Sequence, residues 1–138
     1  MNNIIQKEDK ELLLKDLSAR VPYGVKFKFK YSESLSETIK GISVFNDIII
    51  CSKDESCLID DVKPYLFPLS SMTEEQKKEY NRLRDFVPTY HYEYGDIVED
   101  TELYDNFTSI SYLIANHFDI NGLIPMGLAL DATGKNIY

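Results

Sequence analysis

The sequence has little cysteine, no tryptophan and no long apolar run. Its two cysteines, Cys51 and Cys57, are too few for the multi-disulfide framework of a small secreted domain, so a reducing compartment is the simpler expectation. No apolar run approaches the roughly 18 residues that can span a bilayer, and the N-terminal nine residues have neither the basic nor the apolar region of a signal peptide. These absences predict a cytoplasmic protein that is neither exported nor inserted in a membrane.

Positive charge is also in short supply. Fifteen lysine and arginine residues stand against 23 aspartate and glutamate residues, for a net charge of −8, which repels phosphate backbones and anionic lipid surfaces. We therefore expect neither a nucleic-acid nor a membrane partner. The chain has 138 residues, 43% of them apolar and 28% charged, and this size and composition predict one ordered domain over residues 1–138.

Three segments have helical periodicity or helix-boundary signals. We expect helices at roughly residues 5–18, 73–86 and 106–118. The first gathers leucines on one stripe before a Val-Pro-Tyr-Gly stop signal, and the second opens with a capping box of Thr73 and Gln76. His117 ends the third helix, where a positive imidazole would complement the helix dipole.

The clearest pattern is the alternation of apolar residues and lysines in residues 25–31 (VKFKFKY), which predicts a strand with Phe27 and Phe29 on its buried face. Further strands are expected over residues 37–45 and 48–52, and from residue 57 to about 69, with Pro64 interrupting the last. The fold class is thus α+β: an antiparallel meander of about four strands (roughly 25–69) packed against the three helices.

A two-residue turn at Asn46-Asp47 would join the second and third strands, because both residue types tolerate a positive φ. This turn would set Ser43 opposite Ile50, and the following loop would set Cys51 opposite Cys57. The glycine-punctuated tail, residues 122–138, is expected to be irregular apart from a short strand at residues 128–130.

No catalytic signature is present. A Gly-x-Ser-x-Gly motif does not occur, and Gly134-Lys135 lacks the preceding glycine and following hydroxyl residue of a phosphate-binding loop. The cysteines and histidines are not spaced as the close pairs of a structural zinc site. We therefore predict no catalytic residue, no metal site and no cofactor.

Tyrosine is the notable excess, with ten residues in the chain. Tyr90, Tyr92 and Tyr94 alternate with other residues beside His91, and such amphipathic rings are typical of contact surfaces. These four residues are our predicted partner-binding site. The alternative is that the same row of rings packs across the sheet.

The lysine stripe formed by Lys26, Lys28 and Lys30 has two interpretations. It can contact an acidic partner or a nucleic acid, or it can keep an exposed sheet soluble and its edges unpaired.

Several segments resemble a family of small uncharacterised proteins encoded by phages and mobile elements of gut Bacteroides-type bacteria. The similar segments cover nearly the whole chain: residues 14–26 (LKDLSARVPYGVK), 63–75 (KPYLFPLSSMTEE), 116–119 (NHFD) and 122–132 (GLIPMGLALDA). This chain has Tyr112 where relatives often carry tryptophan, and Asn121 where they carry arginine. The resemblance implies an intracellular protein that acts on host or phage machinery by binding.

These observations favour a non-enzymatic protein-binding factor that contacts a host or phage protein through an acidic, tyrosine-rich surface. The alternative is a small enzyme or ligand-binding protein whose pocket lies between the third helix and the glycine-rich tail, around Tyr112, His117 and Asp119. Self-association of the chain into a homo-oligomer through the tyrosine surface is a third possibility.

Overall fold

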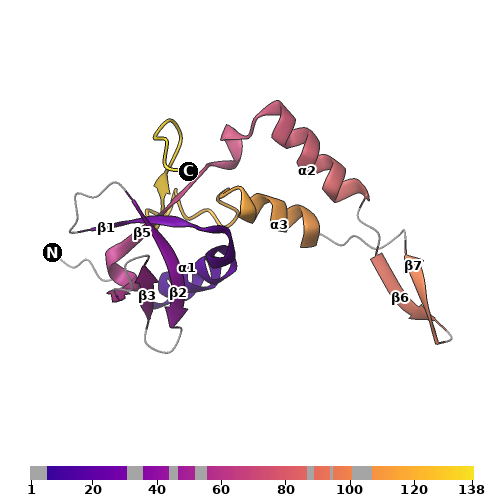
Figure 1. Ribbon diagram of the computed structural model, residues 1–138, viewed down its shortest axis with the longest axis horizontal. Coiled ribbons are helices and arrows are strands. Elements are labelled where there is room, and N and C mark those ends of the chain that lie inside the picture. Colours follow the sequence, from indigo (N-terminus) through magenta and orange to yellow (C-terminus); the bar gives the residue numbers. More distant parts are fainter. Residues whose placement is uncertain are drawn as a thin grey trace.

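A computed structural model of the chain describes residues 6–30, 36–43, 47–51, 56–86, 89–93, 95–100 and 107–138. The helices are α1 (Lys7–Arg20), α2 (Glu74–Phe86) and α3 (Phe107–Ala115), with short 3-10 turns η1 (Val21–Tyr23), η2 (Ile59–Asp61) and η3 (Leu69–Ser71). The strands are β1 (Lys26–Phe29), β2 (Glu37–Ser43), β3 (Ile48–Cys51), β4 (Ser56–Leu58), β5 (Val62–Leu66), β6 (Thr89–Glu93), β7 (Asp96–Asp100) and β8 (Leu130–Asp131). The predicted α+β class is confirmed (Figure 1).

Six strands form the main sheet in the order β4-β3-β2-β1-β5-β8, so the expected count of about four is too low. The first four strands are a meander, as predicted. The chain then passes through η2, where Ile59 is fully buried, and returns to the free edge of β1 as β5. β8 arrives from the tail and pairs with β5 in parallel. A short strand was predicted in this part of the tail, at residues 128–130, but its pairing with β5 was not, because that partner lies more than 60 residues away in sequence.

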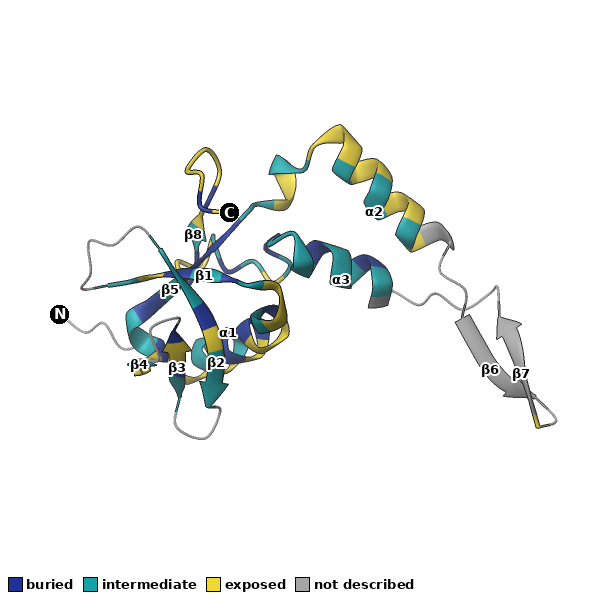
Figure 2. Cartoon of the chain, in the orientation of Figure 1, coloured by how far each residue is buried: buried dark blue, intermediate teal, exposed yellow. Residues whose placement is uncertain are grey.

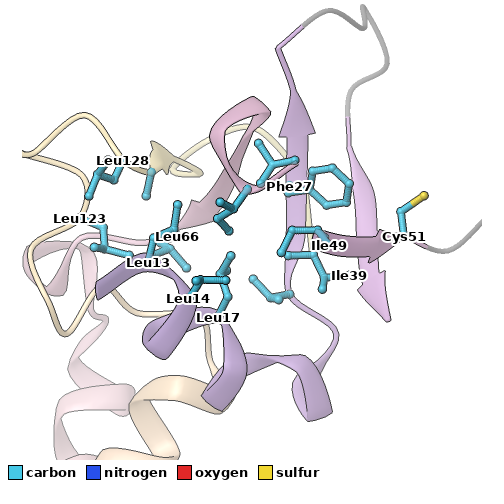
Figure 3. Packing of buried hydrophobic residues seen from close by; sticks show 14 residues of the cluster. Leu13, Leu14, Leu17, Phe27, Ile39, Ile49, Cys51, Leu66, Leu123 and Leu128 are labelled. Carbon is cyan, nitrogen blue, oxygen red and sulfur yellow. The ribbon is translucent and has the colours of Figure 1, made fainter. Parts of the chain in front are cut away.

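Helix α1 covers one face of the sheet and supplies Leu13, Leu14 and Leu17 to the core (Figure 3). Phe27 of β1 is fully buried against this core, Phe29 is half-buried and packs against it, and Lys28 is exposed, which confirms the predicted alternation at the centre of the strand. Each such side chain contributes roughly 1.5–3 kcal/mol when it is removed from water. The other core residues that Figure 3 labels are Ile39, Ile49, Cys51, Leu66, Leu123 and Leu128.

The other two helices do not cover the sheet as predicted. Helix α3 packs against α1 and α2, and α2 packs mainly against α3. Both lie to one side of the sheet (Figure 1). None of the described side chains of α2, residues 74–84, is buried (Figure 2). No helix in the described part of the chain combines the length and the apolar character needed to cross a membrane.

The predicted register of the β2–β3 hairpin is wrong by two residues. Ser43 pairs with Ile48 rather than with Ile50, so the connection is longer than a two-residue turn, although Asp47 does have a positive φ of 53°. A shift of two residues keeps the same side chains of each strand on the same face of the sheet, and Ile49 of β3 is buried.

Cys57 pairs with Ile49 and not, as predicted, with Cys51, which pairs with Ile39. The two cysteines are not joined in a disulfide, and Cys51 is buried.

Pro64 does not interrupt a strand but lies inside β5, opposite Phe27. Lys30 donates its backbone N–H to the Asp61 carbonyl (2.8 Å), so these two residues form a hydrogen-bonded pair. In an antiparallel ladder such pairs alternate with pairs that share no hydrogen bond, and Phe27–Pro64, three positions away, is of the second kind. The N–H that proline lacks would therefore face the other neighbour, β8. Since β8 begins opposite Tyr65, no ladder hydrogen bond is lost at Pro64.

Candidate functional site

The predicted tyrosine site lies on β6, which pairs with β7 in an antiparallel hairpin. Tyr90, His91 and Tyr92 pair through their backbones with Glu99, Val98 and Ile97, and Tyr94 lies outside the described residues. The acidic segment after Gly95 forms β7, the second strand of this hairpin. Gly95 precedes it with a positive φ of 85°, which glycine adopts without steric cost.

The hairpin is separate from the six-stranded sheet. It lies beyond α2 and α3, at the end of the molecule opposite the sheet (Figure 1). The strand that carries the tyrosine row therefore belongs to a two-stranded sheet with β7 and not to the main sheet.

Helix α2 has several local stabilising contacts. Thr73 and Gln76 form the predicted capping box: the Gln76 N–H donates to Thr73 Oγ1 (3.1 Å), and the Thr73 N–H donates to Gln76 Oε1 (2.9 Å). Arg82 donates to both carboxylate oxygens of Glu79 (2.6 and 3.1 Å). This hydrogen bond lowers the pKa of Glu79. A helix held by its cap and surface ion pairs can extend from the domain with little burial.

The three predicted pocket residues lie on or just after α3 and have different roles. Tyr112 is half-buried, and its pKa is raised first by burial and then by the negative charge of Glu79 on α2. Tyr112 therefore belongs to the packing between α2 and α3.

His117 terminates α3 in the left-handed region, with φ 66°. Its N–H donates to the Ile114 carbonyl (3.0 Å), and the Phe118 N–H donates to the Leu113 carbonyl (2.9 Å). This pair of bonds is a Schellman motif, in which glycine is the usual residue at this position. The predicted helix end at residue 118 is thus too late, because the chain leaves the helix after Ala115.

Burial lowers the pKa of His117 to about 4, and the positive charges of Arg20 and Lys26 act in the same direction. The imidazole is therefore neutral at pH 7. The expectation that a positively charged His117 complements the helix dipole is wrong. Its Nδ1 is buried and has no hydrogen-bond partner among the described residues. The ring stacks instead on Tyr138.

Asp119 is buried and its carboxylate has a local task. One oxygen accepts the N–H of Leu123 and the other accepts the N–H of Ile124, both at 2.9 Å. With both oxygens engaged by the backbone, Asp119 fixes the start of the tail. Two cavities near these residues are lined by other side chains. One of about 280 Å³ lies between α1 and α3, beside Asp16 and Asn121, and one of about 230 Å³ lies between the start of α2 and the tail, beside Phe118 and Gly134.

Sequence reasoning missed two polar contacts of the domain. Arg20 is fully buried, pairs with Asp16 one helical turn earlier and donates to the Phe118 carbonyl (2.6 Å). Its i,i+4 spacing from Asp16 was visible in the sequence, but its burial was not. The second contact is made by Tyr138, whose partners are more than 70 residues away in sequence.

Comparison with known proteins gave no match: no protein-family model, no curated protein and no solved structure is significantly similar to this chain. Among the described residues, no group of three or more histidine, cysteine, aspartate or glutamate side chains is arranged to hold a metal ion.

Proposed function

We propose that this protein is a non-enzymatic, intracellular protein-binding factor of a phage or mobile element, and that the β6–β7 hairpin contacts a host or phage protein. The observation that carries the proposal is the position of the hairpin beyond α2 and α3, away from the main sheet (Figure 1). An isolated two-stranded hairpin is at most marginally stable in water. Contact with a partner would supply the packing that this hairpin does not receive from the sheet.

The residue composition of the hairpin supports this proposal. The β6 sequence, TYHYE, carries two tyrosines, and the β7 sequence, DIVED, carries three acidic residues. Tyrosine is enriched at the centres of protein interfaces, and the acidic residues would select a partner with a basic surface. The expected partner is therefore a protein with a positively charged surface.

Affinity capture from the native host tests the proposal. The full-length protein should enrich one protein at low salt, and the double variant Tyr90→Ala/Tyr92→Ala should lose it. The control variant Tyr23→Ala, which removes an exposed tyrosine from η1, should retain it. The proposal fails if nothing is enriched above background, or if the double variant and the control capture the partner equally.

The alternative proposal of an enzyme or ligand-binding pocket has less support. Both carboxylate oxygens of Asp119 bind backbone amides, and the His117 ring is stacked on Tyr138. Self-association through the hairpin is tested separately, because a homo-oligomer that depends on Tyr90 and Tyr92 would be detected by its solution mass.

A further inference from the structure

The outer face of the main sheet carries a cluster of lysines that the proposed function does not use. Phe27 points into the core, so its neighbours Lys26, Lys28 and Lys30 belong to the opposite face of β1. On β5, Val62 is buried in the core, so Lys63 belongs to that same outer face. The stripe on β1 follows from the sequence alternation, whereas only the pairing of β1 with β5 adds Lys63 to it.

Strand register brings the two groups of lysines together. Lys28 pairs directly with Lys63 across β1 and β5. Like charges placed directly opposite each other destabilise an antiparallel pair. Among the described residues, neither of these lysines forms an ion pair. Lys28 and Lys63 thus place two positive charges side by side on the outer face of the sheet, although the net charge of the protein is −8.

A cavity of about 230 Å³ lies at this point, lined by Lys28, Lys30, Lys63 and Leu130. Its wall is built by the tail: β8 begins at Leu130 beside Tyr65. The tail is held there by Lys26, whose Nζ donates to the Ile137 carbonyl (3.0 Å). The cavity is therefore an open one that lies where the tail packs against the outer face of the sheet.

We propose that this cavity binds a compact polyanion that carries two or more phosphate groups. Lysine ammonium groups bind phosphate oxygens as point charges, and among the described residues no acidic side chain lines the cavity. The volume lies below the roughly 300–1,000 Å³ of sites for drug-sized ligands, which fits a diphosphate group better than a larger organic molecule. Bound anion would also relieve the repulsion between Lys28 and Lys63.

Calorimetric titration of the full-length protein with inorganic pyrophosphate and with ADP at low salt tests this site. We expect saturable binding at one site. The double variant Lys28→Gln/Lys63→Gln should weaken it at least about tenfold, since each removed lysine deletes a charged hydrogen bond. The matched control Lys78→Gln removes an exposed lysine from α2 and should bind as the wild type does. Tighter binding of ADP would assign a nucleotide as the ligand, and equal binding would assign the phosphate groups alone.

Thermal unfolding distinguishes a built site from general attraction of anions. Pyrophosphate should raise the melting temperature of the wild type and of Lys78→Gln but not of the double variant. Without anion, the double variant should melt no lower than the wild type, because it has lost a repulsive pair. The inference is overturned if neither ligand binds saturably, or if Lys78→Gln weakens binding as much as the double variant does. It is independent of the hairpin, so neither result bears on the proposed function.

Discussion

The imidazole of His117 stacks on the ring of Tyr138, with the two ring centroids 3.6 Å apart and the planes 11° from parallel. The same tyrosine donates its hydroxyl proton to the Tyr65 carbonyl (2.7 Å) and accepts the backbone N–H of Lys26 (2.9 Å). One side chain therefore connects the end of the chain to α3, β5 and the start of β1.

The hydroxyl of Tyr138 should contribute measurably to stability. Tyr138→Phe keeps the stack on His117 but removes both hydrogen bonds, so we expect the free energy of unfolding to fall by about 1–3 kcal/mol. Urea denaturation measures the change. Tyr23→Phe is the control, because Tyr23 is exposed to a similar extent (44%, against 41% for Tyr138) but its hydroxyl makes no hydrogen bond to the described residues, and it should change the free energy of unfolding by less than about 0.5 kcal/mol. Equal effects of the two variants would contradict the structural role of this hydroxyl.

His117 should make the protein less stable in mild acid. Its pKa is about 4 in the folded protein and 6.5 as its ordinary value, so between these pH values the unfolded chain binds a proton that the folded protein does not. The free energy of unfolding is therefore unaffected by this group above pH 6.5 and falls as the pH drops from 6.5 toward 4.

The variant His117→Asn isolates this contribution, because asparagine tolerates a positive φ but does not titrate in this range. Denaturation at several pH values should show a shallower loss of stability between pH 6.5 and 4 for the variant than for the wild type. Identical pH profiles would show that His117 titrates normally in the folded protein.

Asp119 should be a structural residue. Asp119→Ala leaves the N–H groups of Leu123 and Ile124 without acceptors, and the expected loss of stability is about 2–4 kcal/mol. Asp131 offers a matched control, since it accepts the Thr133 N–H (2.8 Å) at an exposed position. Asp131→Ala should cost less than about 1 kcal/mol, because water can replace an exposed acceptor. Thermal or urea unfolding of both variants provides the measurement.

The pair of Asp16 and Arg20 should be sensitive to removal of one partner. Asp16→Ala leaves the guanidinium of Arg20 buried without its negative partner, which is expected to cost about 3–5 kcal/mol. The control Lys77→Ala removes a surface ion pair with Glu74 and should lower the free energy of unfolding by less than about 1 kcal/mol. A small effect of Asp16→Ala in chemical denaturation would mean that Arg20 reaches water.

Local sequence signals predicted the elements of this fold well. The capping box of Thr73 and Gln76 and the buried position of Phe27 follow from contacts within a few residues, and both are confirmed. Register was harder to predict. The β2–β3 pairing was wrong by two residues because a shift of that size preserves the buried faces, so the hydrophobic pattern does not distinguish the two arrangements.

The candidate sites depended more on long-range contacts. His117 was recognised as a helix end, but its neutral state depends on burial and on the charges of Arg20 and Lys26, which are distant in sequence. The lysine cavity needs β5 to lie beside β1, and that pairing is set by the path of the chain through η2.

The sequence by itself determined the α+β class, the inward and outward faces of β1, and the start of α2, because periodicity and capping act between residues that are close along the chain. Only the tertiary structure decided that β5 pairs with β1, that Lys63 lies opposite Lys28, and that Tyr138 stacks on His117. The physical reason is that each of these contacts depends on how the whole core packs. Burial of the core selects among arrangements that the local signals allow equally.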